Sequence, residues 1–350
     1  MSIGAFIVYN CGCSYPPDQG GSPSDHTISD DFILLPEKYD HDIFWGNYHS
    51  SLWNGNRIYS SGTLRFYDLD DSMKVIHDSI PLYLNSNTQW DVGIEGLIGM
   101  RFNNDRMKII GVQSQYPDVA LGKLVEVDIA TLKISVLVDS TMQVSSAAYL
   151  DDDSIIFYSY GSYSDLDTQP SDAGYYLFIK STGAKKFLLH HISSLGPSEI
   201  LNGFDVHPDH SRILIPSTGN NRAPIVFEFN IMTSKKDTLF TAFDTPSVRW
   251  CLSLRYNSDG SKILYSAYPI KVLDGGATLY DYSETGIIDR KPLSIKILQT
   301  NPYLSLHTNV ICLFPSWSPD EKSIIYGSAP ISSEGRIASH YTATILKAFQ

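Results

Sequence analysis

A short strand–turn–strand motif recurs along this chain, and it constrains the fold more than any other feature of the sequence. Its clearest copy lies within Phe314–Ser328. Pro319 fixes the φ angle that the first central position of a tight turn requires, and Asp320 suits the second central position. The following residues, Ile324–Tyr326, are β-branched and aromatic, which favours a strand. The motif therefore predicts two antiparallel strands joined by a tight turn.

Six copies of this motif divide the chain into repeat units, which we number first to sixth. The copies are Trp53–Ser60, Phe102–Gly111, Tyr149–Tyr158, Val206–Ile215, Tyr256–Tyr265 and Trp317–Tyr326. Their turn residues are Asn54, Asp105, Asp152, Asp209, Asp259 and Asp320, which lie 51, 47, 57, 50 and 61 residues apart. A period of about 50 residues, with several short strands in each unit, is typical of a β-propeller.

The second half of the units supports the same fold. A strand, a turn and an outer strand are expected at Lys123–Leu137, at Tyr175–Leu189 and at Ile225–Leu239. We therefore expect an all-β chain, a six-bladed β-propeller of four-stranded antiparallel blades. The last unit lacks one outer strand, and the N-terminal strand Phe32–Pro36 is expected to supply it. Such a strand would close the ring and remove exposed sheet edges.

Composition limits the class of partner. The 350 residues are 43% hydrophobic, enough for a large core, and 12% aromatic with 22 Tyr, which favours strands. The formal net charge is −12, and Lys and Arg are not clustered, which argues against a nucleic acid as the partner. No apolar stretch is long enough to predict a transmembrane helix.

The first 31 residues are expected to form a flexible tail in front of a single propeller at 32–350. The apolar run Ile3–Tyr9 is followed by Gly12-Cys13 and by the Pro-, Gly- and Ser-rich segment Ser14–Asp25. This order resembles the end of a bacterial lipoprotein signal peptide, which predicts a lipid anchor at Cys13 and a periplasmic or outer-membrane-tethered protein. The apolar run is short and no basic segment precedes it, so a disordered tail with incidental cysteines on a cytoplasmic protein is the alternative.

The repeats also carry a family resemblance. The sequence Ser318-Pro-Asp-Glu-Lys-Ser-Ile-Ile-Tyr326 resembles the PD40-type repeat of TolB-like six-bladed propellers, which is also found in the propeller domains of prolyl oligopeptidases. The match is good at Val206–Ser217 and Tyr256–Ser266 and weaker in the first three units. It implies a six-bladed ring over residues 40–350. No G-x-S-x-G nucleophile elbow occurs in the sequence, so it does not contain the hydrolase part of such a peptidase.

Candidate ligand-binding residues follow from the expected ring. The marker turns should lie on one face, and the segments that lead into the innermost strands should lie around the channel mouth on the opposite face. Convergent polar and aromatic side chains at such a mouth are typical of a ligand site. The candidates there are Arg249, Trp250, His307, Asn309, His49, Trp90, Glu95, Asn202 and His191. Each is also explained as an ordinary channel-lining residue.

No metal or cofactor site is expected from the sequence, although a divalent metal is not excluded. His190 and His191 are adjacent, and neighbouring strand residues point to opposite faces, so at most one of them faces a given site. The run Asp151–Asp153 is better explained as an acidic turn than as a calcium loop.

The expected function is that of a monomeric binding or scaffolding propeller. Its partner would be a protein or a glycan, bound through the channel mouth or the loops, because no local motif for chemistry is present. The alternative is a propeller-type lyase or hydrolase acting on oligosaccharides, whose site would be assembled from several blades without a local motif.

Overall fold

The structure, a computed structural model, is an all-β fold of antiparallel strands. It describes residues 32–36, 51–55, 57–60, 65–69, 75–78, 97–114, 122–161, 172–190, 204–218, 224–240, 248–272, 278–280, 282–302, 309–331 and 342–347. Within these ranges the only helix is a single 3-10 turn, Ser140–Met142. In this part of the chain, no helix has the length and apolar character needed to cross a membrane.

The strands follow the repeat units. The first unit contains β2 (Ser51–Asn54), β3 (Arg57–Ser60), β4 (Arg65–Leu69) and β5 (Val75–Asp78), and the second contains β6 (Leu97–Phe102), β7 (Lys108–Ser114), β8 (Gly122–Asp128) and β9 (Ile134–Val138). The third contains β10 (Val144–Tyr149), β11 (Ser154–Ser159), β12 (Gly174–Ile179) and β13 (Ala184–His190), and the fourth contains β14 (Asp205–Val206), β15 (Arg212–Thr218), β16 (Pro224–Asn230) and β17 (Lys236–Phe240). The fifth contains β18 (Val248–Tyr256), β19 (Lys262–Val272), β20 (Thr278–Tyr280), β21 (Tyr282–Arg290) and β22 (Leu293–Pro302), and the sixth contains β23 (Asn309–Trp317), β24 (Ser323–Ile331) and β25 (Thr342–Lys347).

Hydrogen bonding groups the described strands into five sheets. The first, fourth and fifth units each form their own sheet, whereas the second and third units share an eight-stranded sheet. The only residue pair that joins the two halves of this larger sheet is Val144 with Gly122. The sixth unit is completed by β1 (Phe32–Pro36), which pairs antiparallel with β25. The strand predicted at Phe32–Pro36 is therefore present, and it lies beside the last strand of the chain.

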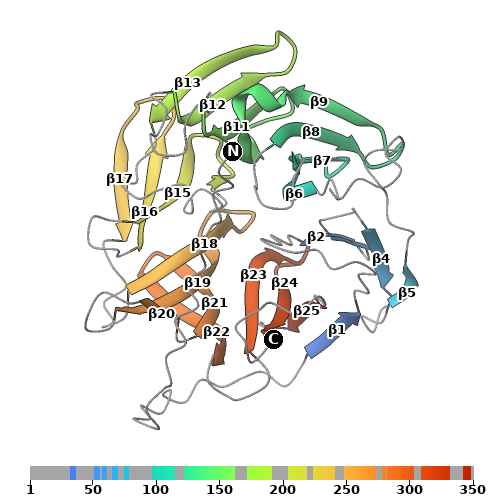
Figure 1. Cartoon of the computed structure of the whole chain (residues 1–350), viewed down its shortest axis with the longest axis vertical. Helices are drawn as coiled ribbons and strands as arrows, with labels where there is room; N and C mark the ends of the chain where they lie inside the picture. The colour runs from blue at the N-terminus through green and yellow to red at the C-terminus, as the bar shows by residue number, and fades with distance from the viewer. Residues whose placement is uncertain are drawn as a thin grey trace, which may run out of the picture.

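The sheets are arranged around a common centre, and β2, β6, β18 and β23, the first strands of four units, lie innermost (Figure 1). The first strands of the units contact one another in turn: β2 with β6, β6 with β10, β10 with β14, β14 with β18, β18 with β23 and β23 with β2. The innermost strands therefore surround the region where a central channel is expected.

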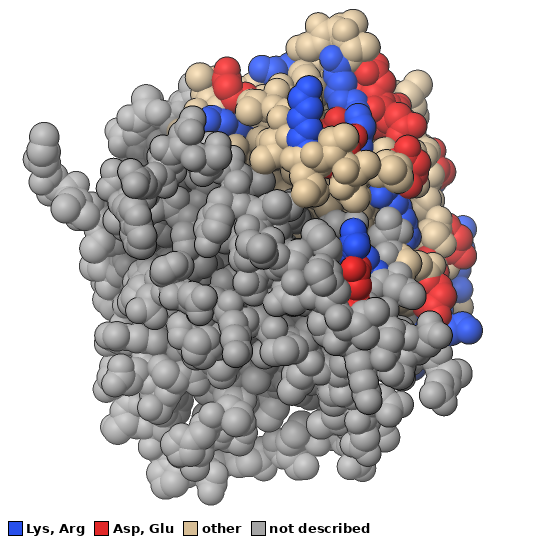
Figure 2. Space-filling view, turned by 90° about the vertical axis from the view of Figure 1, so that its right-hand side faces the viewer, with Lys and Arg blue, Asp and Glu red and all other residues tan. Residues whose placement is uncertain are grey.

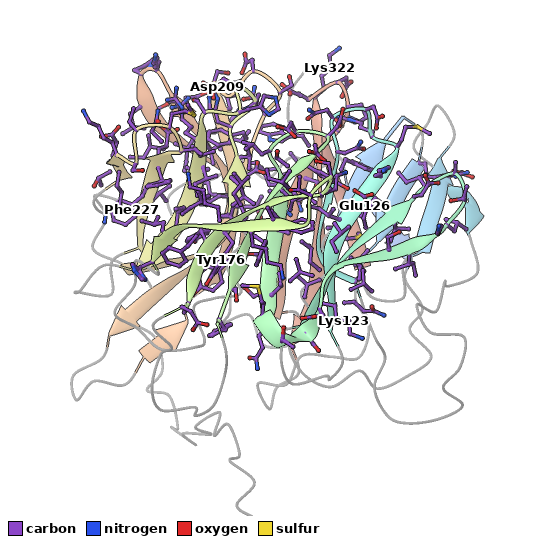
Figure 3. The ribbon with its side chains drawn as sticks, turned by 90° about the horizontal axis from the view of Figure 1, so that it is seen from above. Lys123, Glu126, Tyr176, Asp209, Phe227 and Lys322 are labelled. Carbon is purple, nitrogen blue, oxygen red and sulfur yellow. The ribbon has the colours of Figure 1, made fainter. Side chains whose placement is uncertain are left out.

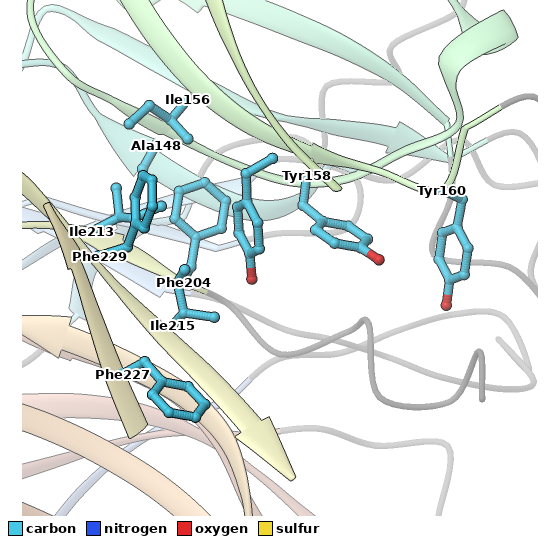
Figure 4. Close-up of a cluster of buried hydrophobic side chains, with 10 residues drawn as sticks. Ala148, Ile156, Tyr158, Tyr160, Phe204, Ile213, Ile215, Phe227 and Phe229 are labelled. Carbon is cyan, nitrogen blue, oxygen red and sulfur yellow. The ribbon is translucent and has the colours of Figure 1, made fainter. Parts of the chain in front are cut away.

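The hydrophobic core lies between neighbouring sheets. Strand β11 alternates its side chains: Ile155 and Phe157 pack in a cluster with the second unit, whereas Ile156 and Tyr158 pack in a cluster with the fourth unit. Figure 4 shows the latter cluster, in which aromatic side chains such as Phe229 fill the space between two sheets. Because a strand presents successive side chains to opposite faces, each sheet can be buried on both sides.

The predicted turn chemistry is confirmed in four units. In each, the backbone N–H of the fourth turn residue donates to the carbonyl of the first, at 2.8 to 3.1 Å: Arg106 to Asn103, His210 to His207, Gly260 to Asn257 and Glu321 to Ser318. The fourth residue has a φ of +58° to +70°, as expected for a type I turn followed by a left-handed residue. The marker carboxylate accepts from the backbone N–H two residues on, for example Asp320 from Lys322 at 3.1 Å.

The turn of the third unit differs from the sequence alignment. Tyr149 pairs with Ile155, six residues on, whereas Tyr256 pairs with Ile263, seven residues on. The shorter turn places Asp151, not Asp152, in the capping role: its Oδ1 accepts from the N–H of Asp153 at 2.9 Å. The marker Asp152, chosen from the sequence, is therefore wrong by one residue. An alignment of the turns without gaps cannot detect that one turn is a residue shorter than the others.

Two buried glutamates fasten neighbouring units together. Glu126 of the second unit accepts from Lys108 of its own unit at 3.0 Å and from Tyr149 and Lys180 of the third unit, each at 2.9 Å. We call these four residues the Glu126 cluster. Burial acts to raise the pKa of Glu126, but the hydrogen bonds from Lys180, Lys108 and Tyr149 outweigh it, so the pKa lies below its usual range.

The fourth and fifth units repeat this arrangement around Glu228. Its carboxylate accepts from Tyr256 at 2.6 Å, lies 2.6 Å from Arg290 Nη2 and lies 3.5 Å from Arg212 Nη1. We call these four residues the Glu228 cluster. Tyr149 and Tyr256 hold the same place in their units, as do Glu126 and Glu228, so the two clusters are built at equivalent positions. Each cluster holds one unit in register with the next.

Candidate functional site

A cavity of about 410 Å³ opens among the marker turns, where five of the six units meet. Figure 3 shows Asp209 and Lys322, both in marker turns, at one edge of the molecule, and Lys123 at the opposite edge. We call the edge that carries Asp209 and Lys322 the turn face. The cavity is lined by residues of the second to sixth units, including the turn residues Asn103, His207, Asn257 and Ser318.

The floor of the cavity is formed by one repeated position. This is the residue directly before the aromatic or apolar residue that opens each motif, and in the second to sixth units it is Arg101, Ala148, Asp205, Arg255 and Ser316, all of which line the cavity. The equivalent residue of the first unit is Leu52, whose side chain lies outside the described residues. Equivalent positions in successive units therefore converge on one point, and three of them carry charge.

Bulges in the innermost strands precede this position. The register shifts between Ile98 and Arg101 in β6, where Gly99 has a φ of +64°, and it shifts between Cys251 and Ser253 in β18. A bulge leaves a residue unpaired and re-aims the side chains that follow. Arg101 and Arg255 therefore both follow a break in strand pairing.

Arg101 is held mainly by backbone carbonyl groups. Its Nη1 donates to the carbonyl of Met100 at 3.0 Å and its Nη2 donates to the carbonyl of Phe204 at 3.1 Å. Its Nε lies 3.7 Å from Asp205 Oδ1, an ion pair beyond hydrogen-bond distance. Arg101 is 7% exposed, so its charge is removed from water without a close carboxylate.

Arg255 is held less firmly than Arg101. Its Nη2 donates to the carbonyl of Met100 at 3.4 Å, the same carbonyl that Arg101 uses, so the two guanidinium groups share one acceptor. Arg255 is 6% exposed. The one carboxylate between them, Asp205, uses its Oδ2 to accept from the backbone N–H of Tyr256 at 2.8 Å.

The ionisation of all three groups reflects this burial. Burial lowers the pKa of Arg101, and burial together with the charge of Arg101 lowers the pKa of Arg255 well below its usual value. Burial also raises the pKa of Asp205, although the two arginines oppose this effect. Each shift shows that the charged form is less stable here than in water, since burial penalises charge.

The rim of the cavity is braced by contacts between units. Asn257 Nδ2 donates to Glu321 Oε2 at 3.2 Å, and the N–H of Ser258 donates to Glu321 Oε1 at 2.5 Å, which joins the fifth unit to the sixth. On the other side, His210 bonds the carbonyl of Leu150 and joins the fourth unit to the third. These contacts fix the shape of the opening before any ligand binds.

The candidates from the sequence stay predictions. His49, Trp90, Glu95, His191, Asn202 and His307 lie outside the described residues. Arg249 and Trp250 lie at the start of β18 and Asn309 at the start of β23, the innermost strands of the fifth and sixth units, and their side chains are also outside the described part. The cavity on the turn face was not predicted, because the marker turns were treated as structural. The signal for it was the charged residues at one repeated position.

A metal site does not emerge from the described residues. Among them, no group of three or more His, Cys, Asp or Glu side chains lies close enough together to hold a metal ion. His190, one of the two histidines considered, packs its ring against Phe187 with 4.5 Å between ring centroids.

Comparison with known proteins bears on the fold. No family model matches the chain, and no curated protein matches it in sequence. The structure is similar to TolB from Acinetobacter baumannii, with a TM-score of 0.51 and 14% identity, over 87% of this chain and 66% of that one, just under two thirds. It is similar to a putative TolB from Agrobacterium tumefaciens, with a TM-score of 0.51 and 11% identity, over 73% of this chain and 81% of that one.

A third similar structure is an oligogalacturonate lyase from Vibrio parahaemolyticus, with a TM-score of 0.46 and 13% identity, over 91% of this chain and 98% of that one. The TolB structures are β-propellers, so the likeness supports a propeller type of fold. Identities this low carry no information on activity, partner or location.

Proposed function

We propose that the chain is a closed six-bladed β-propeller that acts as a binding module, with its ligand entering the central cavity from the turn face. Two observations support the ring. The innermost strands contact one another in sequence and return from β23 to β2, and β1 pairs with β25. In this arrangement the eight-stranded sheet counts as two blades that share one bridging pair.

The closure has a direct test. Deleting residues 1–30 keeps β1, which pairs with β25, and should leave the melting temperature nearly unchanged. Deleting residues 1–40 removes β1 and exposes the edge of β25, so the melting temperature should fall sharply. Equal effects of the two deletions would contradict closure by β1.

The observation that carries the binding function is the cavity itself, because it places two buried arginines and one carboxylate at a braced opening. A concave site with a few convergent polar groups is the usual form of a ligand pocket. The partner is a protein or a glycan with a group that reaches the cavity. The lipoprotein-like sequence at Gly12-Cys13 supports an extracytoplasmic location for this binding, and loss of fatty-acid labelling in Cys13→Ser would test it.

A blocking variant tests the site. Ser258 is exposed at the rim, at the first central position of its turn, so Ser258→Trp should cover the opening without disturbing the core. We expect a panel of oligosaccharides and short peptides to contain members that raise the melting temperature of the wild type but not of Ser258→Trp. Mass spectrometry should recover them intact. Equal binding by both proteins would contradict this location, and cleaved products would identify an oligosaccharide lyase or hydrolase instead.

A further inference from the structure

We propose that the cavity binds a single carboxylate group between Arg101 and Arg255. The inference rests on the proposed binding function and names the chemistry of the ligand. The site joins units that are far apart in the sequence, since Arg101 comes from β6 and Arg255 from β18, and it needs no residue outside the described part of the chain.

Arg101 and Arg255 both line the cavity, and both are short of close acceptors. Among the described residues, their buried Nε atoms have no hydrogen-bond partner, and the Nε of Arg101 lies 3.7 Å from Asp205 Oδ1. A buried donor without a partner is unfavourable by about 1–3 kcal/mol, and more when the group is charged. A carboxylate in the cavity would supply these guanidinium groups with an acceptor, because a guanidinium group and a carboxylate match in geometry.

The charge count selects one negative charge. The charged side chains that line the cavity are those of Arg101, Arg106, Arg255, Asp205 and Glu321, which together leave one positive charge. A monoanion cancels this charge, whereas a dianion such as phosphate would leave an uncompensated negative charge beside Asp205. Since an uncompensated buried charge is strongly unfavourable, the cavity should prefer a carboxylate to a phosphate group.

The shape of the opening favours a carboxylate at the end of a side chain or a small acid. The cavity is small, and its rim is closed by contacts between the fifth and sixth units. A group that projects from a larger molecule can reach the arginines while the rest of that molecule remains outside. A protein-borne carboxylate and a free acid present the same chemistry at the site.

Fluorine NMR can measure this preference with two matched probes. Fluoroacetate carries one negative charge, and monofluorophosphate carries two at neutral pH. We expect the wild type to bind fluoroacetate about tenfold more tightly than monofluorophosphate, and Arg255→Met to lose about tenfold of the fluoroacetate affinity, which corresponds to one lost charged hydrogen bond. Lys322→Met removes an exposed positive charge from the turn face outside the cavity and should bind as the wild type does.

Asp205→Asn provides the opposite change. The amide oxygen can still accept from the N–H of Tyr256, and the site gains one net positive charge. The preference should therefore reverse in favour of monofluorophosphate. A reversal would also show that the variant is folded, because a disrupted cavity would bind neither probe.

Displacement of fluoroacetate identifies the source of the carboxylate. A blocked tripeptide, acetyl-Ala-Glu-Ala-amide, should displace the probe where a protein side chain can reach the site, and its Gln counterpart should not. Displacement by acetate but not by the Glu peptide would support the same carboxylate site and restrict it to small acids.

The outcomes that overturn the inference differ from those that overturn the binding function. No fluoroacetate binding by the wild type, or unchanged binding by Arg255→Met, would rule out the carboxylate site. A neutral ligand that binds the wild type and is blocked by Ser258→Trp would then leave the proposed function standing. Fluoroacetate binding that survives Ser258→Trp would contradict both.

Discussion

The Glu126 cluster can be compared with the group of Arg101, Arg255 and Asp205 in the cavity, which we call the channel site. Each contains two cations and one carboxylate, but the charges are paired at different distances. In the Glu126 cluster the carboxylate accepts hydrogen bonds from both lysines at 2.9 and 3.0 Å, and the side chain of Lys108 is 38% exposed to water. In the channel the closest ion pair is 3.7 Å, and Arg101 and Arg255 are almost fully buried. Close pairing and access to water make the first a structural contact.

The Glu228 cluster shows that an unpartnered donor does not by itself mark a site. Arg290 Nε has no hydrogen-bond partner among the described residues, like the two channel arginines. Its Nη2, however, lies 2.6 Å from Glu228, and its Nη1 donates to the carbonyl of Gly260 at 2.8 Å. The difference lies in the carboxylate contact. A buried cation with a directly bonded carboxylate stabilises the fold, and one without it is available to a ligand.

The largest effect on stability is expected from Glu228→Ala. This change leaves Arg290 and Arg212 without their shared carboxylate, so the free energy of unfolding should fall by about 3 kcal/mol. Urea unfolding measures the change. Glu126→Ala is the matched comparison and should lose a similar amount, because each cluster has one cation that is about a third exposed, Lys108 or Arg212, and one that is mostly buried. Clearly unequal losses would show that the two clusters are not equivalent.

Gly260→Ala should disturb the Glu228 cluster through shape alone. Gly260 has a φ of +70°, and a Cβ there would clash with the imidazole of His207, whose Nε2 lies 3.2 Å from Arg290 Nη1. The positive φ alone destabilises by about 1–2 kcal/mol, and the displaced imidazole adds about 1 kcal/mol or more. Thermal unfolding of Gly260→Ala and Gly183→Ala separates the effect of the positive φ from that of the clash. Gly183 has a φ of +69° but nothing within 4 Å of an added Cβ. A difference of zero between the two variants would contradict the contact.

Removing one hydroxyl from each cluster should have a smaller effect. Tyr149→Phe and Tyr256→Phe delete the hydrogen bonds to Glu126 and Glu228 but leave both cations in place. Each should lower the free energy of unfolding by about 1.5 kcal/mol, the usual value for a bond to a charged group. Because the two tyrosines hold equivalent places, their losses should agree. A loss at only one of them would show that the clusters are not a repeated device.

The two regions should also respond oppositely to pH. The pKa of Glu126 lies below its usual 4.5, so its contribution to stability is present above that pH and is lost as the pH falls through the folded value. The pKa of Asp205 is raised above its usual 3.8, so its contribution is lost as the pH rises from there through the folded value. The urea midpoint should therefore rise less steeply from acid to neutral pH in Glu126→Gln than in the wild type. In Asp205→Asn it should rise more steeply.

Much of the fold could be predicted from the sequence, because it depends on local chemistry. Pro319 and Asp320 specify their turn within four residues, and the strand at Phe32–Pro36 was expected from the missing outer strand of the sixth unit. The Glu126 cluster could not be predicted in this way. It joins Lys108 to Lys180 across two units, and such a contact depends on how the sheets pack and not on spacing along the chain.

The channel site could have been predicted in part from the sequence, by comparing the residues at each repeated position of the units. Aligning the units places Arg101, Asp205 and Arg255 at one repeated position, and a ring brings such positions together. Two facts still required the structure: the bulges before Arg101 and Arg255, and the burial that separates their charges from water. On the described part of the side shown in Figure 2, Lys and Arg are interspersed with Asp and Glu. Neither this mixed surface nor the net charge of −12 indicates a cavity lined by arginines.

The most direct test of the different roles of these charges is the unfolding of Arg255→Met with and without acetate. Without acetate the variant should match the wild type to within about 0.5 kcal/mol, because replacing a poorly paired buried charge by an apolar group is close to neutral. Added sodium acetate, compared with sodium chloride at equal ionic strength, should raise the urea midpoint of the wild type only. A variant as unstable as Glu228→Ala, or one that acetate stabilises as much as the wild type, would contradict a binding role for Arg255.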